Sequence, residues 1–202
     1  MKLNPDELDA LTEIINIGVG RAAASLSEMA SQKIILQIPR VEVFDIDAIP
    51  ESLEFFEEKD IASVKQDFTG KYSGRGTLIF PKESAFALVN LLLGQTESSS
   101  TEFDDEYEGV LTEVGNILLN AILGSIATAM LGPLTYNIPI YEQTSLTDIF
   151  YQYAKQMDNS LQTQVVYAEA SFEISRQNIQ GQFLIFCKVP SISQLLHEAE
   201  VT

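Results

Sequence analysis

The chain has little sulfur and little imidazole. Its 202 residues include one cysteine, one histidine and no tryptophan. A single cysteine excludes an intrachain disulfide, and one histidine with one distant cysteine cannot form a zinc-type ligand set. Cys187 directly follows an apolar run at 183–186, which predicts a small core side chain. The sequence therefore predicts no metal site of its own.

Positive charge is also scarce. Twelve lysines and arginines stand against 29 aspartates and glutamates, and the formal net charge is −17. The phosphates of nucleic acids and the headgroups of anionic membranes both require a basic surface. This composition argues against either partner. It predicts a soluble cytoplasmic protein that its own charge keeps dispersed.

Targeting and membrane signals are missing from the two places where they would be expected. The N-terminus carries Asp6, Glu7 and Asp9 where a secretory signal needs a basic start and an apolar core. The most apolar stretch, 117–134, contains Asn120 and several Gly or Pro breakers, and its flanks are not basic. This pattern favours a buried helix over a membrane-spanning one.

Familiar catalytic and nucleotide-binding motifs are absent from the sequence. No G-x-S-x-G elbow and no G-x-x-x-x-G-K-[ST] phosphate loop occur. The glycine pairs at 18–20 and 74–76 lack the third glycine and the strand-to-helix context of a dinucleotide fingerprint. These absences exclude a serine hydrolase triad and an ordinary nucleotide site.

Hydrophobic periodicity predicts alternating helices and strands. We expect helices at 7–30, 82–93, 107–131, 144–156 and 191–199. We expect strands at 33–46, 61–68, 76–80, 135–141, 165–174 and 180–188, with a glycine-rich turn around 69–74 and a surface loop or short helix at 48–60. The length suits one large domain or two small ones.

Two segments about one hundred residues apart repeat each other. Residues 11–16 read LTEIIN and residues 111–116 read LTEVGN, and a proline follows 23 positions after each asparagine. The order helix, strand, strand, strand, helix occurs over 7–94 and again over 107–202, with an acidic, serine-rich linker at 95–106. We therefore predict a single α/β domain over 1–202, built from two pseudo-symmetric halves that share a sheet on which the helices pack.

The repeated Glu and Asn lie on the outer face of the first predicted helix. At about 100° per residue, Asp9, Glu13, Asn16 and Gly20 fall on one stripe, well away from the apolar stripe. A single exposed Glu and Asn on a helix are ordinarily just solvated. Their repetition, with a matched proline, favours a functional role, because packing alone gives no reason to repeat exposed polar side chains.

The chemistry available to such a pair is limited but definite. An Asn amide can donate and accept at once and so hold a water, and a Glu can pair with a cation on a partner. Together they could orient a hydrolytic water, the role that orientation plays in phosphoryl hydrolysis. Small residues follow the first pair at 18, 20 and 22–24. They either allow close approach to another backbone or leave room for a partner's loop.

The pattern Asp9-x3-Glu13-x2-Asn16-x22-Pro39 resembles the signature of the CheC, CheX and FliY family of chemotaxis phosphatases. Two copies in one chain are more similar to CheC than to single-copy CheX. In the second copy, Gly109 replaces the first Asp or Ser of the signature.

The resemblance implies hydrolysis of the aspartyl phosphate of a CheY-type response regulator in bacterial chemotaxis. In this family the Asn orients the attacking water and the Glu contacts a lysine of the regulator. The implied catalytic residues are Glu13, Asn16, Glu113 and Asn116, and the supporting motif residues are Asp9, Pro39 and Pro139. The resemblance implies no cofactor of the protein's own, because Mg²⁺ belongs to the regulator, and it adds complex formation with CheD as a second family property.

Two other functions remain open from the sequence. The same fold could serve as a non-catalytic adaptor that binds or sequesters a response regulator or CheD. It could also be a purely structural adaptor, for which changes at Glu13 or Asn16 would leave every binding constant unaltered. Catalysis requires only substoichiometric protein, whereas sequestration requires one equivalent.

Overall fold

The computed structural model describes residues 3–47, 61–95, 104–155, 163–174 and 177–200. The described helices are α1 (Pro5–Ala30), α3 (Lys82–Leu93), α4 (Asp105–Ile126), a π-helical turn η1 (Ala127–Leu131), α5 (Leu146–Lys155) and α6 (Ile192–Glu200). The described strands are β1 (Ile34–Asp45), β2 (Ile61–Gly70), β3 (Ser73–Pro81), β4 (Leu134–Tyr136), β5 (Ile140–Thr144), β6 (Thr163–Ile174) and β7 (Gln177–Lys188). The segment 48–60, expected as a loop or short helix, lies outside the described residues.

Within the described chain, the strands form one sheet in the order β1-β6-β7-β3-β2-β4, and β5 also pairs with β2. β1, the first strand of the first half, therefore pairs with β6, the second strand of the second half. In the same way, β4 and β5, which together form the first strand of the second half, pair with β2. At the centre, β3 pairs with β7 through Thr77↔Leu184 and Leu78↔Phe183. Leu78 and Leu184 occupy equivalent positions when the sequences of the two halves are aligned. A two-fold axis that exchanges these two residues would produce the observed register.

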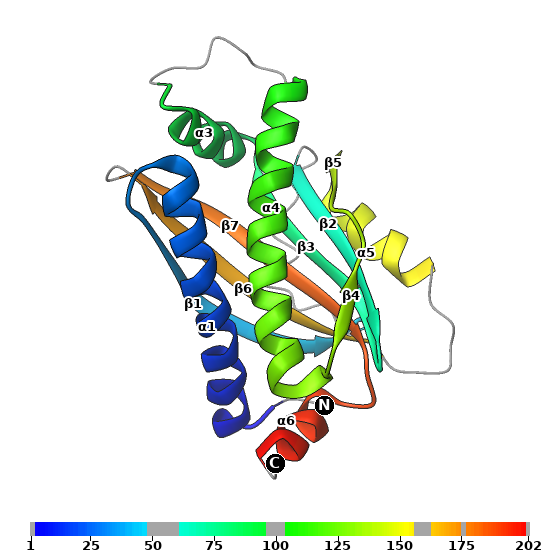
Figure 1. The fold of residues 1–202 in the computed structure, drawn as a ribbon. Coiled ribbons are helices and arrows are strands. Elements are labelled where there is room, and N and C mark those ends of the chain that lie inside the picture. Colours follow the sequence, from blue (N-terminus) through cyan, green and yellow to red (C-terminus); the bar gives the residue numbers. More distant parts are fainter. Residues whose placement is uncertain (1–2, 48–60, 96–103, 156–162, 175–176, 201–202) are drawn as a thin grey trace.

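Helices cover both faces of the sheet, as Figure 1 shows. α1 and α4 lie side by side across one face, and their apolar side chains join the larger core cluster with α3 and α6. α5 packs on the other face, where Phe150 and Tyr153 meet Phe186 of β7. The mixed α/β fold with helices packed on a shared sheet is thus confirmed.

The starts of the two long helices differ from the sequence expectation. α1 begins at Pro5 and is capped by Asn4: its side chain accepts from the Glu7 amide at 2.9 Å, and its own amide donates to the Glu7 carboxylate at 2.7 Å. Asp104 caps α4 by accepting from the Tyr107 amide at 3.0 Å. Most of the linker expected at 95–106 lies outside the described residues, and its last two residues already belong to α4.

Gly74, which was predicted to form a turn, lies inside a strand instead. β2 continues to Gly70 and β3 resumes at Ser73, so the turn is shorter than the expected 69–74. A Cβ on Gly74 would lie 2.1 Å from the Phe186 carbonyl oxygen, and one on Gly76 would lie 3.0 Å from the Leu119 side chain. These glycines permit close packing of neighbouring backbone and side chains rather than a change of chain direction.

α1 and α4 approach each other closely at Gly18. A Cβ there would lie 2.7 Å from the Ala121 carbonyl oxygen and from the Ile122 Cα. Gly20, two residues later, has nothing within 4 Å of its Cβ position. Of the two explanations offered by the sequence for these small residues, close helix packing applies to Gly18.

α4 with η1 is also the membrane candidate. Asp105–Leu131 is long and apolar enough to span a bilayer by length and composition. However, 56% of its apolar 18-residue stretch is buried inside the protein. The helix packs against α1 and the sheet, as the core helix of a globular protein does.

The first strand of each half is interrupted at its proline. Between β1 and β6 the register shifts between Gln37 and Arg40, which brackets Pro39. Residues 137–139, which include Pro139, separate β4 from β5. Proline has no backbone N–H to donate to the sheet, so a break in the ladder is where it is tolerated.

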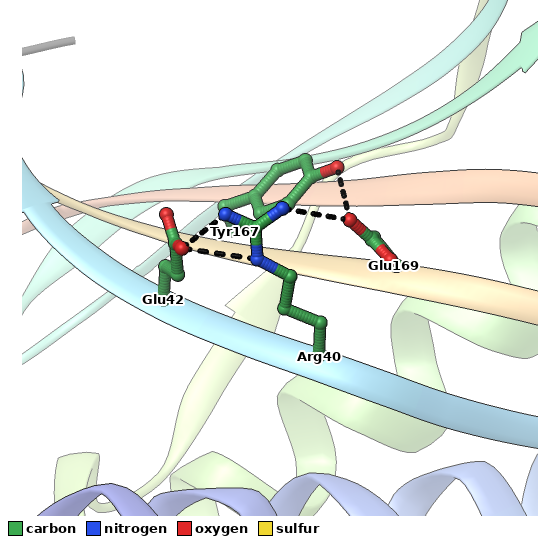
Figure 2. Close-up of polar contacts among 4 residues, drawn as sticks. All are labelled: Arg40, Glu42, Tyr167 and Glu169. Carbon is green, nitrogen blue, oxygen red and sulfur yellow. Dashed lines mark hydrogen bonds and ion pairs between the residues drawn. The ribbon is translucent and has the colours of Figure 1, made fainter. Parts of the chain in front are cut away.

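Just beyond each break, charged side chains form ion pairs between the first strand of the half and the neighbouring strand. Figure 2 shows these contacts for β1 and β6. Arg40 donates to Glu42 through Nε at 3.0 Å and to Glu169 of β6 at 3.1 Å, and Tyr167 donates to Glu169 at 3.4 Å. In the second half, Lys65 of β2 pairs with Glu142 of β5. Both groups lie on the sheet face opposite α1 and α4.

Candidate functional site

The two repeated helical segments have equivalent local structure. Leu11 and Leu111 are each 1% exposed and anchor their helices in the core. Thr12 donates to the Leu8 carbonyl at 2.7 Å, and Thr112 donates to the Glu108 carbonyl at 2.7 Å. The next residue in each segment is an exposed glutamate.

The first pair lies on an open helix face. Asp9, Glu13, Asn16 and Gly20 are all exposed, as the helical stripe predicted. Ile17 beside them is 47% exposed. Pro39 is exposed on β1, which packs beside α1. This face can meet a partner without any rearrangement of α1.

The second pair, Glu113 and Asn116, lies on α4, where Asn116 lines a pocket. Glu113 is exposed and Asn116 is partly buried. Asn116 lines a cavity of about 520 Å³ together with Gln66, Asn120, Tyr136, Asn137, Ile138 and Pro139. The structure therefore brings Asn116 and Pro139 to one pocket although 23 positions separate them in the chain. Gly109, at the position of Asp9, is exposed with nothing within 4 Å of its Cβ position.

Several amide side chains line this pocket. Asn120 Nδ2 donates to Asn116 Oδ1 at 2.6 Å. Gln66 Nε2 donates to the Asn137 carbonyl at 3.0 Å and so spans the break between β4 and β5. Burial raises the pKa of the Tyr136 phenol. The side chain of Ile138 is 84% exposed at the same edge.

Sequence reasoning missed Asn120 and Gln66 as pocket residues. Asn120 stands four positions after Asn116 and therefore on the same helix face, so spacing could have found it. Gln66 is 2% exposed within a strand, and nothing in its local sequence connects it to a helix fifty residues later. Among the residues that the structure describes, no group of three or more His, Cys, Asp or Glu side chains could hold a metal ion.

Comparison with known proteins relates the first repeated segment to a protein family. The model of the CheC-like family matches residues 7–43, which contain Asp9, Glu13, Asn16 and Pro39. The chain is also similar to the CheY-P phosphatase CheC of Bacillus subtilis (strain 168), with 26% identity over 129 residues. The family model thus covers the first of the two repeated segments.

The chain is also similar to FliY proteins. It is 27% identical over 129 residues to the flagellar motor switch phosphatase FliY of Bacillus subtilis (strain 168). The crystal structure of Thermotoga maritima FliY superposes with a TM-score of 0.74 at 21% identity, covering 100% of this chain and 97% of that one. The curated alignments span 62% of this chain and 60% of CheC, and 63% of this chain and 32% of FliY.

Proposed function

We propose that this protein hydrolyses the aspartyl phosphate of a CheY-type response regulator in bacterial chemotaxis. The observation that carries the proposal is the pair of Glu–Asn sets at equivalent positions of α1 and α4: Glu13, Asn16 and Glu113 are exposed, and Asn116 lines the pocket. The names of the curated CheC and FliY relatives, which are phosphatases, support the reaction class.

In this proposal the asparagine places the attacking water. The amide of Asn16 or Asn116 accepts a hydrogen bond from the water and can donate one to a phosphoryl oxygen. The water oxygen then forms the new bond to phosphorus as the bond to the aspartyl oxygen breaks. The products are inorganic phosphate and a free carboxylate, and the water's proton leaves with the phosphate or to solvent. Positioning supplies the acceleration, since neither amide is an acid or a base.

The glutamates act on the partner rather than on phosphorus. A carboxylate beside the phosphoryl group would repel it, so Glu13 and Glu113 are proposed to pair with a cationic side chain of the regulator. With a net charge of −17 on this protein, a cation on the regulator would favour docking. Exposed Ile138 and Ile17 add apolar contact area next to the two asparagines. We expect any Mg²⁺ to be carried by the regulator, and binding of CheD remains a separate expectation.

The decisive experiment measures phosphate loss from a CheY-type regulator labelled with a small phosphodonor. The protein is added at one fiftieth of an equivalent, so that only turnover shortens the half-life. N16A and N116A are tested singly and together. Loss of one oriented hydrogen-bonding group at a reacting centre costs about 10²-fold or more in kcat, so the double variant should be no faster than the regulator alone.

The matched control is the double variant S25A/T128A, which removes one exposed hydroxyl from α1 and one from η1, the continuation of α4. It should keep full activity. Undiminished turnover by N16A/N116A would refute the catalytic proposal. Slowing of phosphate loss that requires a full equivalent of protein would instead identify the non-catalytic, sequestering adaptor.

A further inference from the structure

The two proposed sites are not equal, because two amide side chains at the second have no counterpart at the first. Asn120 follows Asn116 by four positions and donates to its Oδ1 at 2.6 Å. The corresponding position in α1 is Gly20, which has no side chain and open space around it. The amide of Asn16 is therefore exposed without such a neighbour, whereas that of Asn116 is held.

Gln66 differs between the halves in the same way. It lies on β2 opposite the break that contains Pro139, and its amide donates to the Asn137 carbonyl across that break. On β6, the residue opposite the break at Pro39 is Ala170, since Gln37 pairs with Ser171 and Arg40 pairs with Glu169. Alanine cannot bridge the break, so the first site has no equivalent polar wall.

Two acceptors in the second pocket are left open. Gln66 Oε1 and Asn120 Oδ1 are buried and have no hydrogen-bond partner among the described residues. Gln66 is 2% exposed, and both side chains line the pocket with Asn116. A buried acceptor without a partner is unfavourable, so the pocket is suited to receive a hydrogen-bond donor beside Asn116.

We propose that Asn120 is a positioning residue that fixes the amide of Asn116, and that this makes the second site the faster of the two. The inference rests on the proposed phosphatase function. With Oδ1 accepting from Asn120, rotation of the Asn116 amide is restricted, and its Nδ2 and second lone pair keep one orientation toward the pocket. A preorganised amide loses less rotamer freedom when it captures the water, whereas Asn16 must be ordered on each encounter.

The test isolates each site. The N16A background leaves the second site, and the N116A background leaves the first. In N16A, the change N120G copies the first site. One hydrogen bond of ordinary net strength corresponds to about a five- to tenfold change in rate, so kcat should fall by about that factor while KM stays within about twofold. In N116A, the reciprocal change G20N should raise kcat.

A charge-switchable variant separates positioning from simple packing. In N16A/N120D, the introduced carboxyl group can donate to Asn116 when it is protonated, but it can only accept when it is ionised. Turnover relative to N16A at each pH should therefore rise as the pH falls through the aspartate range, whereas N16A/N120G should give a constant ratio. T128A in the N16A background is the neutral control, and thermal melting verifies that every variant folds.

The outcomes distinguish the two levels of the proposal. If N16A and N116A are both inactive and the unmodified protein does not turn over, the proposed function itself fails. If N16A turns over and N120G leaves its kcat unchanged, the positioning role is refuted. Should N120G melt early, the pH ratio of N120D decides: a flat ratio overturns the inference and a rising one upholds it.

Discussion

Two glycines in one helix provide the sharpest test of the structure. Gly18 and Gly20 both lie in the interior of α1, and the same change to alanine should move stability in opposite directions. Alanine is favoured over glycine inside a helix by about 0.5–1 kcal/mol, and this gain applies to both positions. The difference between the variants therefore reports only what the added methyl group meets.

At Gly18 the methyl group meets backbone. Its carbon would lie 2.7 Å from the Ala121 carbonyl oxygen, the Ile122 Cα and the Ser125 hydroxyl, so α1 and α4 must separate. Overpacking of this kind costs about 1–3 kcal/mol. G18A should therefore be less stable than G20A by about 1–3 kcal/mol, which at about 2–4 °C per kcal/mol is a difference in Tm of several degrees.

Urea unfolding followed by far-ultraviolet circular dichroism measures both variants against the parent. G20A should be more stable than the parent by about 0.5–1 kcal/mol, since nothing lies within 4 Å of its new carbon. Equal midpoints for G18A and G20A would contradict the close approach of α1 and α4.

Three further outcomes follow from groups away from the pocket. Hydrogen bonds from Ser193 and from the Asn4 amide lower the pKa of Glu7, so its contribution to stability is present above the ordinary value of 4.5 and is lost as the pH falls below it; E7Q should flatten this acid dependence in melts at pH 3–6. Burial raises the pKa of Cys187 to about 12, so a thiol reagent at pH 8 should label it only on unfolding, and rapid labelling of the native protein would contradict its burial. Arg75, whose side chain is 10% exposed, forms a bidentate pair with Asp67 at 2.6 and 3.1 Å, and R75A should cost about 0.5–1.5 kcal/mol in urea unfolding, because its hydrogen bonds are lost while water can solvate the 42% exposed carboxylate.

Local pattern sufficed for the elements that carry the site. The apolar stripe of α1 also fixed which residues face outward, and Asp9, Glu13, Asn16 and Gly20 are exposed as predicted. A helical stripe has one buried side, so its polar residues have one possible direction. The roles of these residues stay a prediction.

Contacts between residues far apart in the chain could not be predicted from the sequence. Glycine permits both turns and close contacts, so the pattern at 69–74 indicated a turn where Gly74 instead lies within β3. The pairing of β1 with β6 depends on an edge-to-edge choice that alternation along one strand does not encode. The contact of Gln66 with Asn137 depends on the corresponding pairing of β2 with β4 and β5, and so could not be inferred from either residue.

The exchange of first strands between halves restricts how the molecule can be divided. Neither half contains the neighbour that its own second strand requires, so expressing 1–95 or 104–202 alone would leave an edge of β2 or β6 without its partner. Because one polypeptide carries both copies, each can accumulate its own substitutions, as Gly20 and Asn120 show. An assembly of two identical half-length chains would be bound to keep its faces the same.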